Sequence, residues 1–228
     1  MIYLTWLGQG GYLLSNGGEI FAIDPYLSDT LEQRKGYHRI EPIPIPPQDV
    51  KAQTVFCTHC HLDHLDPGTI RGLEKDCIFA GPDSCCEKFR ELGISQGNIK
   101  RFNRGDRLKK DGFVFTAAFA RHTKDSIGIV VEYQGKRIYF TGDTLYHKEL
   151  GERCDIIIPC INGRMGNLTP EEAAVLTLKC HAKLAIPSHY GMFRENTIDP
   201  QRFCEALANT KVRTMILRCG ETVQIDLH

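Results

Sequence analysis

The chain is predicted to be an α/β protein in which two β-sheets are covered by helices. Short apolar or alternating runs, typical of strands, fill both halves of the chain, and segments with helix-starting residues interrupt them. Two β-rich halves with interspersed helices favour a sandwich of two sheets with the helices outside. The length of 228 residues suits one domain with a substantial core, so we expect a single domain over residues 1–228.

The first half of the chain is predicted to open with short strands joined by tight turns. The glycine cluster at residues 8–11 lies between two strands rather than at the start of a helix, so it indicates a turn and not a phosphate-binding loop. One helix is expected from Pro67 to about Lys75, and another from its N-cap Asp83 to about Leu92. The strands of this half are expected at residues 2–7, 12–15, 19–23, 55–57 and 78–80.

The second half is predicted to repeat this mixture of strands and helices. Thr169, followed by Pro170, has the residues of a capped helix start, and this helix is expected to end near Cys180. Another helix is expected at residues 199–208. The strands of this half are expected at residues 99–102, 113–119, 127–133, 137–141, 155–159, 183–187, 213–217 and 222–225.

Residues 34–49 contain four prolines and are predicted to form no regular structure. Long irregular loops in compact domains are frequently functional. The composition leaves three roles open for this segment: a lid over a binding site, a contact between subunits, or a plain linker.

Composition and charge are those of a globular protein without a strong electric field. Basic and acidic residues balance at 28 each, so neither nucleic acid nor an anionic membrane is an expected partner. The apolar runs are shorter than a membrane span and residues 1–10 lack the pattern of a signal peptide, so the expected location is cytoplasmic. A small-molecule substrate is the expected partner, and a homo-oligomer stays open. The ten cysteines are expected to be reduced, mostly buried thiols.

Residues 59–66 contain three imidazoles and two carboxylates, a density that metal binding explains best. Neutral imidazole suits zinc, and carboxylates also bind harder ions such as manganese. If this segment is extended, Cys60 points away from the face that His59 and His61 share, so it is not expected to be a ligand. The pattern therefore predicts a metal site with further donors elsewhere in the chain.

Three downstream residues are candidates for those donors because each follows a predicted strand. His122 follows residues 113–119, Asp143 follows residues 137–141, and His189 follows residues 183–187. Donors placed at strand ends can converge on one site, so all three are predicted metal ligands.

The sequence resembles the metallo-β-lactamase superfamily. The resemblance implies an αβ/βα four-layer sandwich of two mixed β-sheets flanked by helices, with a dinuclear metal site. The matching residues, spread over nearly the whole chain, are Trp6-Leu7-Gly8, Ile23-Asp24-Pro25, residues 59–64, His122, Thr141-Gly142-Asp143 and residues 186–191.

The resemblance also implies a ligand set for two divalent metal ions per chain, zinc or manganese. Asp143 would bridge both ions, and Asp24 would be a carboxylate that orients a ligand imidazole. Carried over position by position, the other ligands are His59, His61 and His122 for the first ion, and Asp63, His64 and His189 for the second.

Within the superfamily, the chain resembles the ascorbate-6-phosphate lactonase-like branch. The residues that carry this likeness are Trp6-Leu7-Gly8, residues 61–66, Gly81-Pro82 and residues 186–193. It implies a hydrolase in which a metal-bridging hydroxide attacks a small anionic lactone or ester. Asp63 would be the catalytic residue that carries a proton to the leaving oxygen.

Three further residues are predicted to bind the substrate. Asn162 and Arg164 follow the predicted strand at residues 155–159, and the Arg164 guanidinium could hold a phosphate or carboxylate with two hydrogen bonds. Tyr190, next to His189, could contribute a hydroxyl group.

Two alternatives stay open beside the lactonase hypothesis. The same dinuclear site supports phosphodiesterase or nuclease chemistry, although the balanced charge argues against a nuclease. A non-catalytic metal-binding module would be expected to lack at least one ligand, and all seven positions are filled. A thioesterase of the glyoxalase II type is disfavoured because Leu65 and Asp66 occupy the positions where that group has two glycines.

Overall fold

The computed structural model describes residues 1–74 and 76–225 and separates into two compact units. Unit 1 comprises the described residues of Met1–Phe102, Met192–Glu195 and Arg218–His228, and unit 2 comprises Asn103–Gly191 and Asn196–Leu217. The single domain over residues 1–228 stays a prediction.

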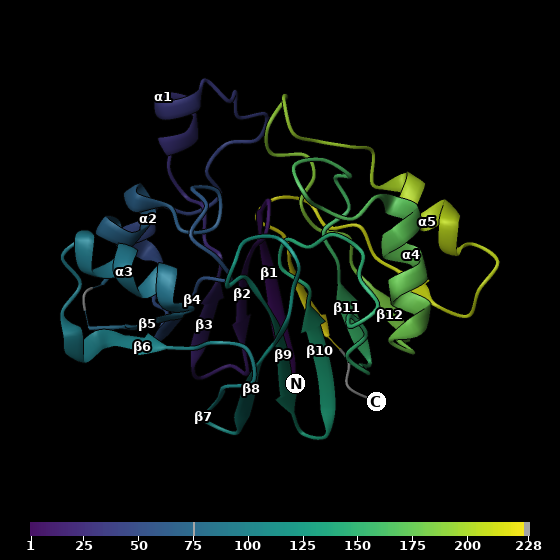
Figure 1. The fold of residues 1–228 in the computed structure, drawn as a ribbon, viewed down its shortest axis with the longest axis horizontal. Coiled ribbons are helices and arrows are strands. Elements are labelled where there is room, and N and C mark those ends of the chain that lie inside the picture. Colours follow the sequence, from purple (N-terminus) through teal and green to yellow (C-terminus); the bar gives the residue numbers. More distant parts are fainter. Residues whose placement is uncertain (75, 226–228) are drawn as a thin grey trace. The chain divides into compact units, whose positions relative to one another are not determined.

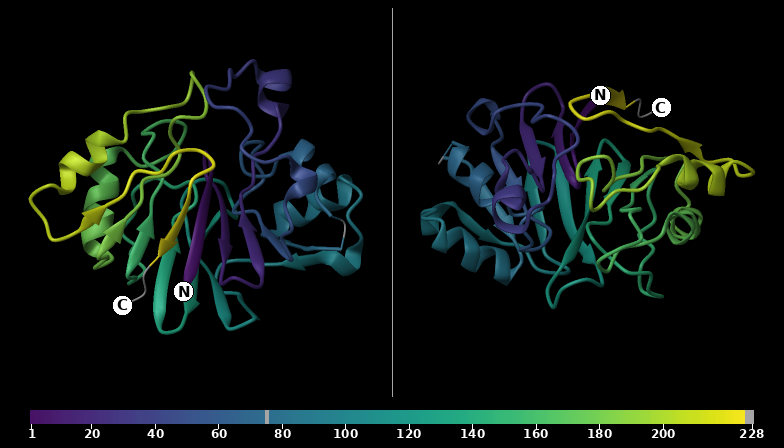
Figure 2. Two further views of the ribbon diagram at one scale, coloured as in Figure 1. Left: turned by 180° about the vertical axis from the view of Figure 1, so that it is seen from behind. Right: turned by 90° about the horizontal axis from the view of Figure 1, so that it is seen from above.

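Unit 1 contains a mixed seven-stranded sheet in the order β14-β1-β2-β3-β4-β5-β6. Neighbours from β14 to β3 are antiparallel, and neighbours from β3 to β6 are parallel. Figure 2 shows β14, drawn in yellow, beside the purple β1. The strands are β1 (Ile2–Gly8), β2 (Gly11–Ser15), β3 (Ile20–Ile23), β4 (Thr54–Phe56), β5 (Ile78–Gly81), β6 (Ile99–Arg101) and β14 (Thr222–Ile225).

The helices of unit 1 follow their capping residues. Asp66 caps α2 by accepting a hydrogen bond from the Gly68 amide, and α2 ends at Gly72, while Lys75 lies outside the described residues. The predicted N-cap of α3 was wrong: Pro82 holds that position, because its extended backbone precedes a helix that already includes Asp83. Helix α3 packs against β5 and β6 (Figure 1). The helices are α1 (Thr30–Lys35), η1 (Pro47–Asp49), α2 (Pro67–Gly72), α3 (Asp83–Glu91) and η2 (Gln96–Asn98).

The proline-rich segment at residues 34–49 packs within unit 1. Arg39 forms a β-bridge with Phe193, and its guanidinium lies 5.0 Å from the Tyr26 ring centroid and donates to the Ser28 carbonyl at 2.8 Å. Ile43 packs against the hydrophobic core of the same unit. The segment is therefore held by apolar packing and hydrogen bonds, which a plain linker would lack.

Unit 2 contains a second mixed seven-stranded sheet, in the order β13-β12-β11-β10-β9-β8-β7. Strands β7 to β10 are antiparallel neighbours, and β10 to β13 are parallel neighbours. Strand β7 was not expected because its charged residues alternate with only half-buried ones. The strands are β7 (Arg107–Lys110), β8 (Phe113–Phe119), β9 (Ile127–Tyr133), β10 (Lys136–Phe140), β11 (Ile156–Ile158), β12 (Leu184–Ala185) and β13 (Arg213–Thr214).

Two helices, α4 (Pro170–Lys179) and α5 (Gln201–Leu207), pack side by side in unit 2 (Figure 1). Thr169 forms the predicted cap of α4: its hydroxyl accepts from the Glu172 amide at 3.2 Å, and the Glu172 carboxylate accepts from the Thr169 amide at 2.9 Å. Two sheets with flanking helices confirm the predicted α/β class. Among the described residues, no helix combines the length and apolarity that crossing a membrane requires.

Candidate metal centre

Three loops of unit 1 meet at one edge of its sheet because the strands before them run in the same direction. Strand β1 is antiparallel to β2, which is antiparallel to β3, and β3 is parallel to β4. The carboxyl ends of β1, β3 and β4 therefore share an edge. Gln9 follows β1, Asp24 follows β3, and the histidine-rich segment follows β4.

The histidine-rich segment forms a compact turn rather than an extended strand. The amides of His64 and Leu65 both donate to the His61 carbonyl, at 3.0 and 2.7 Å. Its apolar side chains anchor it: Cys60 and Leu65 pack into the core of unit 1, and Leu62 packs into a cluster with Tyr26, Leu31, Met192 and Phe193. The predicted donors thus alternate with anchoring residues.

The imidazoles of the segment stand close together. The ring centroids of His59 lie 4.6 Å from those of His61 and 4.2 Å from those of His64. His59 and His64 are fully buried, whereas His61 is exposed. Two buried imidazoles this close together indicate a polar functional site, because apolar side chains are the usual occupants of a buried position.

The Asp24 carboxylate orients the His64 ring. Asp24 Oδ2 lies 2.7 Å from His64 Nδ1, and the Thr58 amide and hydroxyl donate to its two oxygens at 2.7 and 2.6 Å. In a neutral imidazole the proton is then on Nδ1, which leaves the Nε2 lone pair facing Asp63 Oδ2 at 3.7 Å. A carboxylate behind a ligand imidazole is common at metal sites.

Two residues that sequence reasoning missed lie against this set of donors. Gln9 donates from its side-chain amide to Asp63 Oδ2 at 3.0 Å. A Cβ atom on Gly10 would lie only 2.8 Å from His64 Cε1, so glycine leaves room for the ring. The position of the glycine-rich turn at the carboxyl end of β1 could have indicated both residues.

Unit 2 gathers three predicted donors at one edge of its own sheet. Strands β8 and β10 run in the same direction because both are antiparallel to β9, and β10, β11 and β12 are parallel. His122, Asp143 and His189 follow β8, β10 and β12 respectively, so their strands end at the same edge.

The Asp143 carboxylate faces a different imidazole with each oxygen. Oδ2 lies 3.7 Å from His122 Nε2, and Oδ1 lies 3.3 Å from His189 Nε2. The carbonyl of Gly166 accepts from His122 Nδ1 at 3.1 Å, which places the lone pair on Nε2, toward Asp143. A Cβ atom on Gly166 would come within 2.9 Å of the His122 ring.

The donors of each unit fit a divalent metal ion. Two atoms bound to one zinc ion at about 2.1 Å with a tetrahedral angle lie roughly 3.4 Å apart. The pairs His64–Asp63, His122–Asp143 and His189–Asp143 are separated by 3.7, 3.7 and 3.3 Å. Imidazole nitrogen and carboxylate oxygen are ligands that zinc and manganese accept.

Backbone strain accompanies these donors. Gln9, Asp24 and His189 have φ angles of 50°, 45° and 67°, in the left-handed region that non-glycine residues seldom adopt. Such strain concentrates at functional sites, where the surrounding structure enforces it. The three strained residues all lie at the strand ends described above.

Each unit has a buried thiol close to its predicted ligands: Cys57 near His64 in unit 1, and Cys160 near Asp143 in unit 2. Burial raises the pKa of Cys57 well above its usual value, and burial together with the Asp143 charge raises the pKa of Cys160 to about 12. Both thiols are protonated at neutral pH. Cys57 Sγ contacts the His64 carbonyl at 3.5 Å and Cys160 Sγ contacts the Thr144 carbonyl at 3.8 Å, as expected of protonated thiols that donate weak hydrogen bonds.

The predicted substrate-binding residues differ in exposure. Arg164 is exposed, whereas the Asn162 amide is buried, donates to Asn196 Oδ1 at 2.8 Å and accepts from Asn167 at 2.9 Å. The buried Tyr190 hydroxyl donates to the Leu217 carbonyl at 2.7 Å. These contacts favour structural roles for Asn162 and Tyr190, and all three substrate assignments stay predictions.

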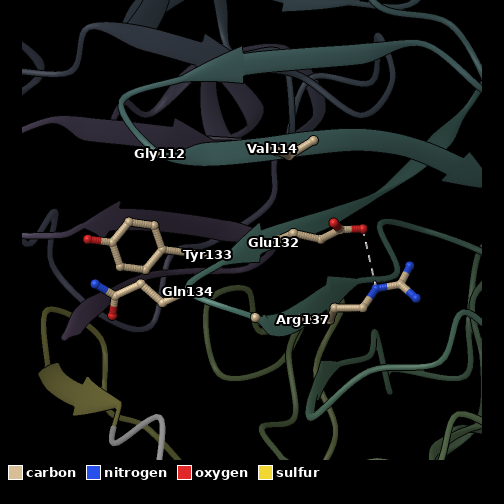
Figure 3. A pocket seen from close by; sticks show the side chains of 7 residues that line it. Gly112, Val114, Glu132, Tyr133, Gln134 and Arg137 are labelled. Carbon is tan, nitrogen blue, oxygen red and sulfur yellow. Dashed lines mark ion pairs between the residues drawn. The ribbon is translucent and has the colours of Figure 1, made fainter.

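A surface hollow in unit 2 lies away from the predicted donors. It is formed around the β9–β10 turn, and the ion pair between Glu132 and Arg137, at 3.6 Å, spans one side of it (Figure 3). Tyr133 stacks on Phe113 beside it. None of the predicted ligands lines this hollow.

Two mixed sheets whose strand ends carry histidine and aspartate side chains are the arrangement expected of a metal-dependent hydrolase of the predicted superfamily. Residues 20–190 match the family model described as "Beta-lactamase superfamily domain". The chain belongs to this family, and the predicted superfamily is confirmed.

Relatives match the chain over nearly its full length, and solved structures share its fold. A "UPF0173 metal-dependent hydrolase" of Pyrobaculum aerophilum is 25% identical, with 97% of this chain and 99% of the relative covered. The structure of Igni18, a metallo hydrolase from Ignicoccus hospitalis, has a TM-score of 0.78 at 22% identity, covering 100% and 99%. An isothiocyanate hydrolase from Delia radicum gut bacteria has a TM-score of 0.81 at 20% identity, covering 98% and 99%.

Proposed function

We propose that the chain is a metal-dependent hydrolase that binds two divalent ions, zinc or manganese, and cleaves a small anionic lactone or ester. Membership of the family supports the hydrolase class. The printed name of the Pyrobaculum aerophilum relative, a metal-dependent hydrolase, supports the metal requirement. The likeness to the ascorbate-6-phosphate lactonase branch supports the substrate class.

The observation that carries this proposal is the geometry of Asp143. A carboxylate with one oxygen toward His122 and the other toward His189 is suited to lie between two ions.

The family pattern assigns the donors to the ions. When bound, the two ions would supply an activated water and polarise the substrate oxygen. The donors would be His59, His61 and His122 for one ion, Asp63, His64 and His189 for the other, and Asp143 for both.

The chain's own groups supply the proton chemistry. Water adds to the substrate carbonyl carbon, the bond from that carbon to the leaving oxygen breaks, and the leaving oxygen takes up a proton. Asp63, whose side chain is 17% exposed, is the group that would carry this proton. Gln9 holds its Oδ2 atom in place through a hydrogen bond.

Exposed cations of unit 2 support an anionic substrate. Arg121 precedes the ligand His122, Lys124 follows it by two residues, and Arg164 lies two residues before Gly166, whose carbonyl contacts His122. All three cations are exposed. With balanced net charge, the proposed partner is a small molecule rather than nucleic acid or a membrane, and the proposed location is the cytoplasm.

The test combines metal content with hydrolysis assays. The purified protein is expected to hold two equivalents of zinc or manganese and to hydrolyse sugar-phosphate lactones. His61→Ala, at an exposed ligand whose loss leaves the core intact, is expected to abolish turnover.

Other outcomes separate the alternatives. Turnover of bis(p-nitrophenyl) phosphate without lactone hydrolysis would favour a phosphodiesterase on the same site. Two bound ions without turnover of either substrate class would favour a non-catalytic module. Less than one equivalent of metal after reconstitution would contradict the dinuclear proposal.

A further inference from the structure

The glycine-rich turn between β1 and β2 is occupied by one large polar residue, Gln9. Its side chain is fully buried, and its backbone has a φ angle of 50°. Glycine adopts this conformation without strain and flanks Gln9 on both sides. The turn alone would therefore be better served by glycine at this position, which indicates a role for the Gln9 side chain.

The contacts of Gln9 connect the turn to the metal-binding segment. Its carbonyl accepts from the Trp6 indole at 3.1 Å, which holds the turn, and its side-chain amide donates to Asp63 Oδ2 at 3.0 Å. The same Oδ2 atom lies 3.7 Å from His64 Nε2. The hydrogen bond from Gln9 thus ends on the Asp63 oxygen that faces His64, another predicted metal ligand.

An amide donor at this point controls the orientation of the Asp63 carboxylate. The terminal torsion of an aspartate is soft, because it joins an sp³ to an sp² carbon and has no steep staggered wells. Asp63 is also partly exposed, so water would otherwise compete for its oxygens. A buried amide that donates to one oxygen fixes the rotation of the carboxylate and stays neutral, so it adds no charge beside the ions.

We propose that Gln9 is a positioning residue that presets the Asp63 carboxylate for metal binding, and that the β1–β2 turn is thereby part of the metal centre. The inference rests on the proposed function only in taking Asp63 as a metal ligand. Outer partners of metal ligands commonly contribute about 10- to 100-fold to metal affinity.

The experiment is a metal titration of the full-length protein. The apo protein is titrated with zinc in competition with a chromophoric chelator, and the dissociation constants of both equivalents are fitted. Gln9→Met keeps the length and volume of the side chain but removes the donor. We expect it to weaken one of the two zinc equivalents by about 10- to 100-fold and to leave the other equivalent unchanged.

Two controls separate positioning from a general loss of structure. Gln53→Met is the matched variant, since Gln53 also makes a part-buried side-chain hydrogen bond in unit 1, accepting from the Ile20 amide at 2.6 Å. It is expected to retain both zinc constants. Thermal unfolding of the apo proteins is expected to give Gln9→Met a midpoint no lower than that of Gln53→Met.

A double-mutant cycle tests whether Gln9 acts through Asp63. In an Asp63→Ala background, Gln9→Met is expected to cause no further loss of zinc affinity. Equal loss in both backgrounds, or zinc constants of Gln9→Met equal to those of the unmodified protein, would overturn the inference. The absorption spectrum of the cobalt-substituted protein gives an independent readout, and an unchanged spectrum in Gln9→Met would also count against it.

The outcome for Gln9 is distinguishable from that of the proposed function. A protein that binds two zinc ions but cleaves neither substrate class would contradict the proposed hydrolysis, while the titration would still decide the role of Gln9. A protein that binds neither zinc nor manganese would overturn both.

Discussion

The two units present predicted ligands in opposite ways. Unit 1 places four within six consecutive residues, 59–64, on one turn. Unit 2 takes three from positions up to 67 residues apart, at the ends of β8, β10 and β12. The first arrangement depends on local sequence, and the second depends on the sheet.

The groups that support the ligands differ in the same way. In unit 1, side chains hold the ligands: Asp24 contacts His64, and Gln9 contacts Asp63. In unit 2, the described support of His122 is a backbone carbonyl, that of Gly166. Support by side chains can be removed by a single substitution, whereas support by a carbonyl must be disturbed through the backbone.

The largest expected effect on activity comes from substituting Asp143, which faces the imidazoles of His122 and His189. Asp143→Ala is expected to lower kcat/KM by more than about 1000-fold, because one carboxylate serves both ions in the proposed centre. Metal analysis should show loss of both equivalents. Retention of one tightly bound ion would show that Asp143 serves only one.

The next effect tests support by side chains in unit 1. Asp24→Ala is expected to weaken metal binding by about 10- to 100-fold, because the His64 ring loses its carboxylate partner. Stability should fall by about 1–3 kcal/mol, since the buried Thr58 amide loses its acceptor. Asp29→Ala, at a half-exposed ion pair with Arg39, is the control and should retain metal affinity. Chemical denaturation and zinc titration measure the two effects.

A smaller effect compares the two glycines that lie against ligand imidazoles. Gly10→Ala and Gly166→Ala should each weaken zinc binding by roughly tenfold, because the new Cβ displaces a ring. Gly166 has a φ angle of 88°, so its substitution should also destabilise the fold by about 1–2 kcal/mol. Gly97→Ala, with open space around the added carbon, is the matched control. Equal zinc constants in all three variants would contradict the role of the two glycines.

The smallest expected effect on metal binding comes from substituting the buried thiols Cys57 and Cys160. Their raised pKa values keep Cys57 and Cys160 protonated at pH 8, so a disulfide reagent should label them only after unfolding. Cys57→Ala and Cys160→Ala should retain both metal equivalents and lose about 1 kcal/mol of stability. Loss of a metal equivalent in either variant would identify that thiol as a ligand.

Much of the fold was predictable because its strands carry strong local patterns, as in β8 and β9, whose apolar residues are buried in runs. The capping box of α4 was equally local. Strand β7 was missed because pairing with β8 stabilises a segment rich in charge. The predicted strand at residues 213–217 was too long, since β13 pairs only at Arg213–Thr214.

The candidate site was predictable where a histidine or aspartate follows a predicted strand. It was less predictable where the role of a residue depends on a contact with a residue distant in sequence. His122, Asp143 and His189 could be selected because each follows a strand. The role of Gln9 depends on the common direction of β1, β3 and β4, which no local pattern reveals. The inward contacts of Tyr190 depend on Leu217, a residue distant in sequence.

The pairing of β1 with β14 has a consequence for biosynthesis. The ribosome makes residues 2–8 more than two hundred residues before residues 222–225, which are their outer hydrogen-bonding partner. Until then β1 is an edge strand with open backbone groups, which is a template for aggregation. The nascent chain therefore leaves this edge uncovered until residues 222–225 have been made and β14 can pair with β1.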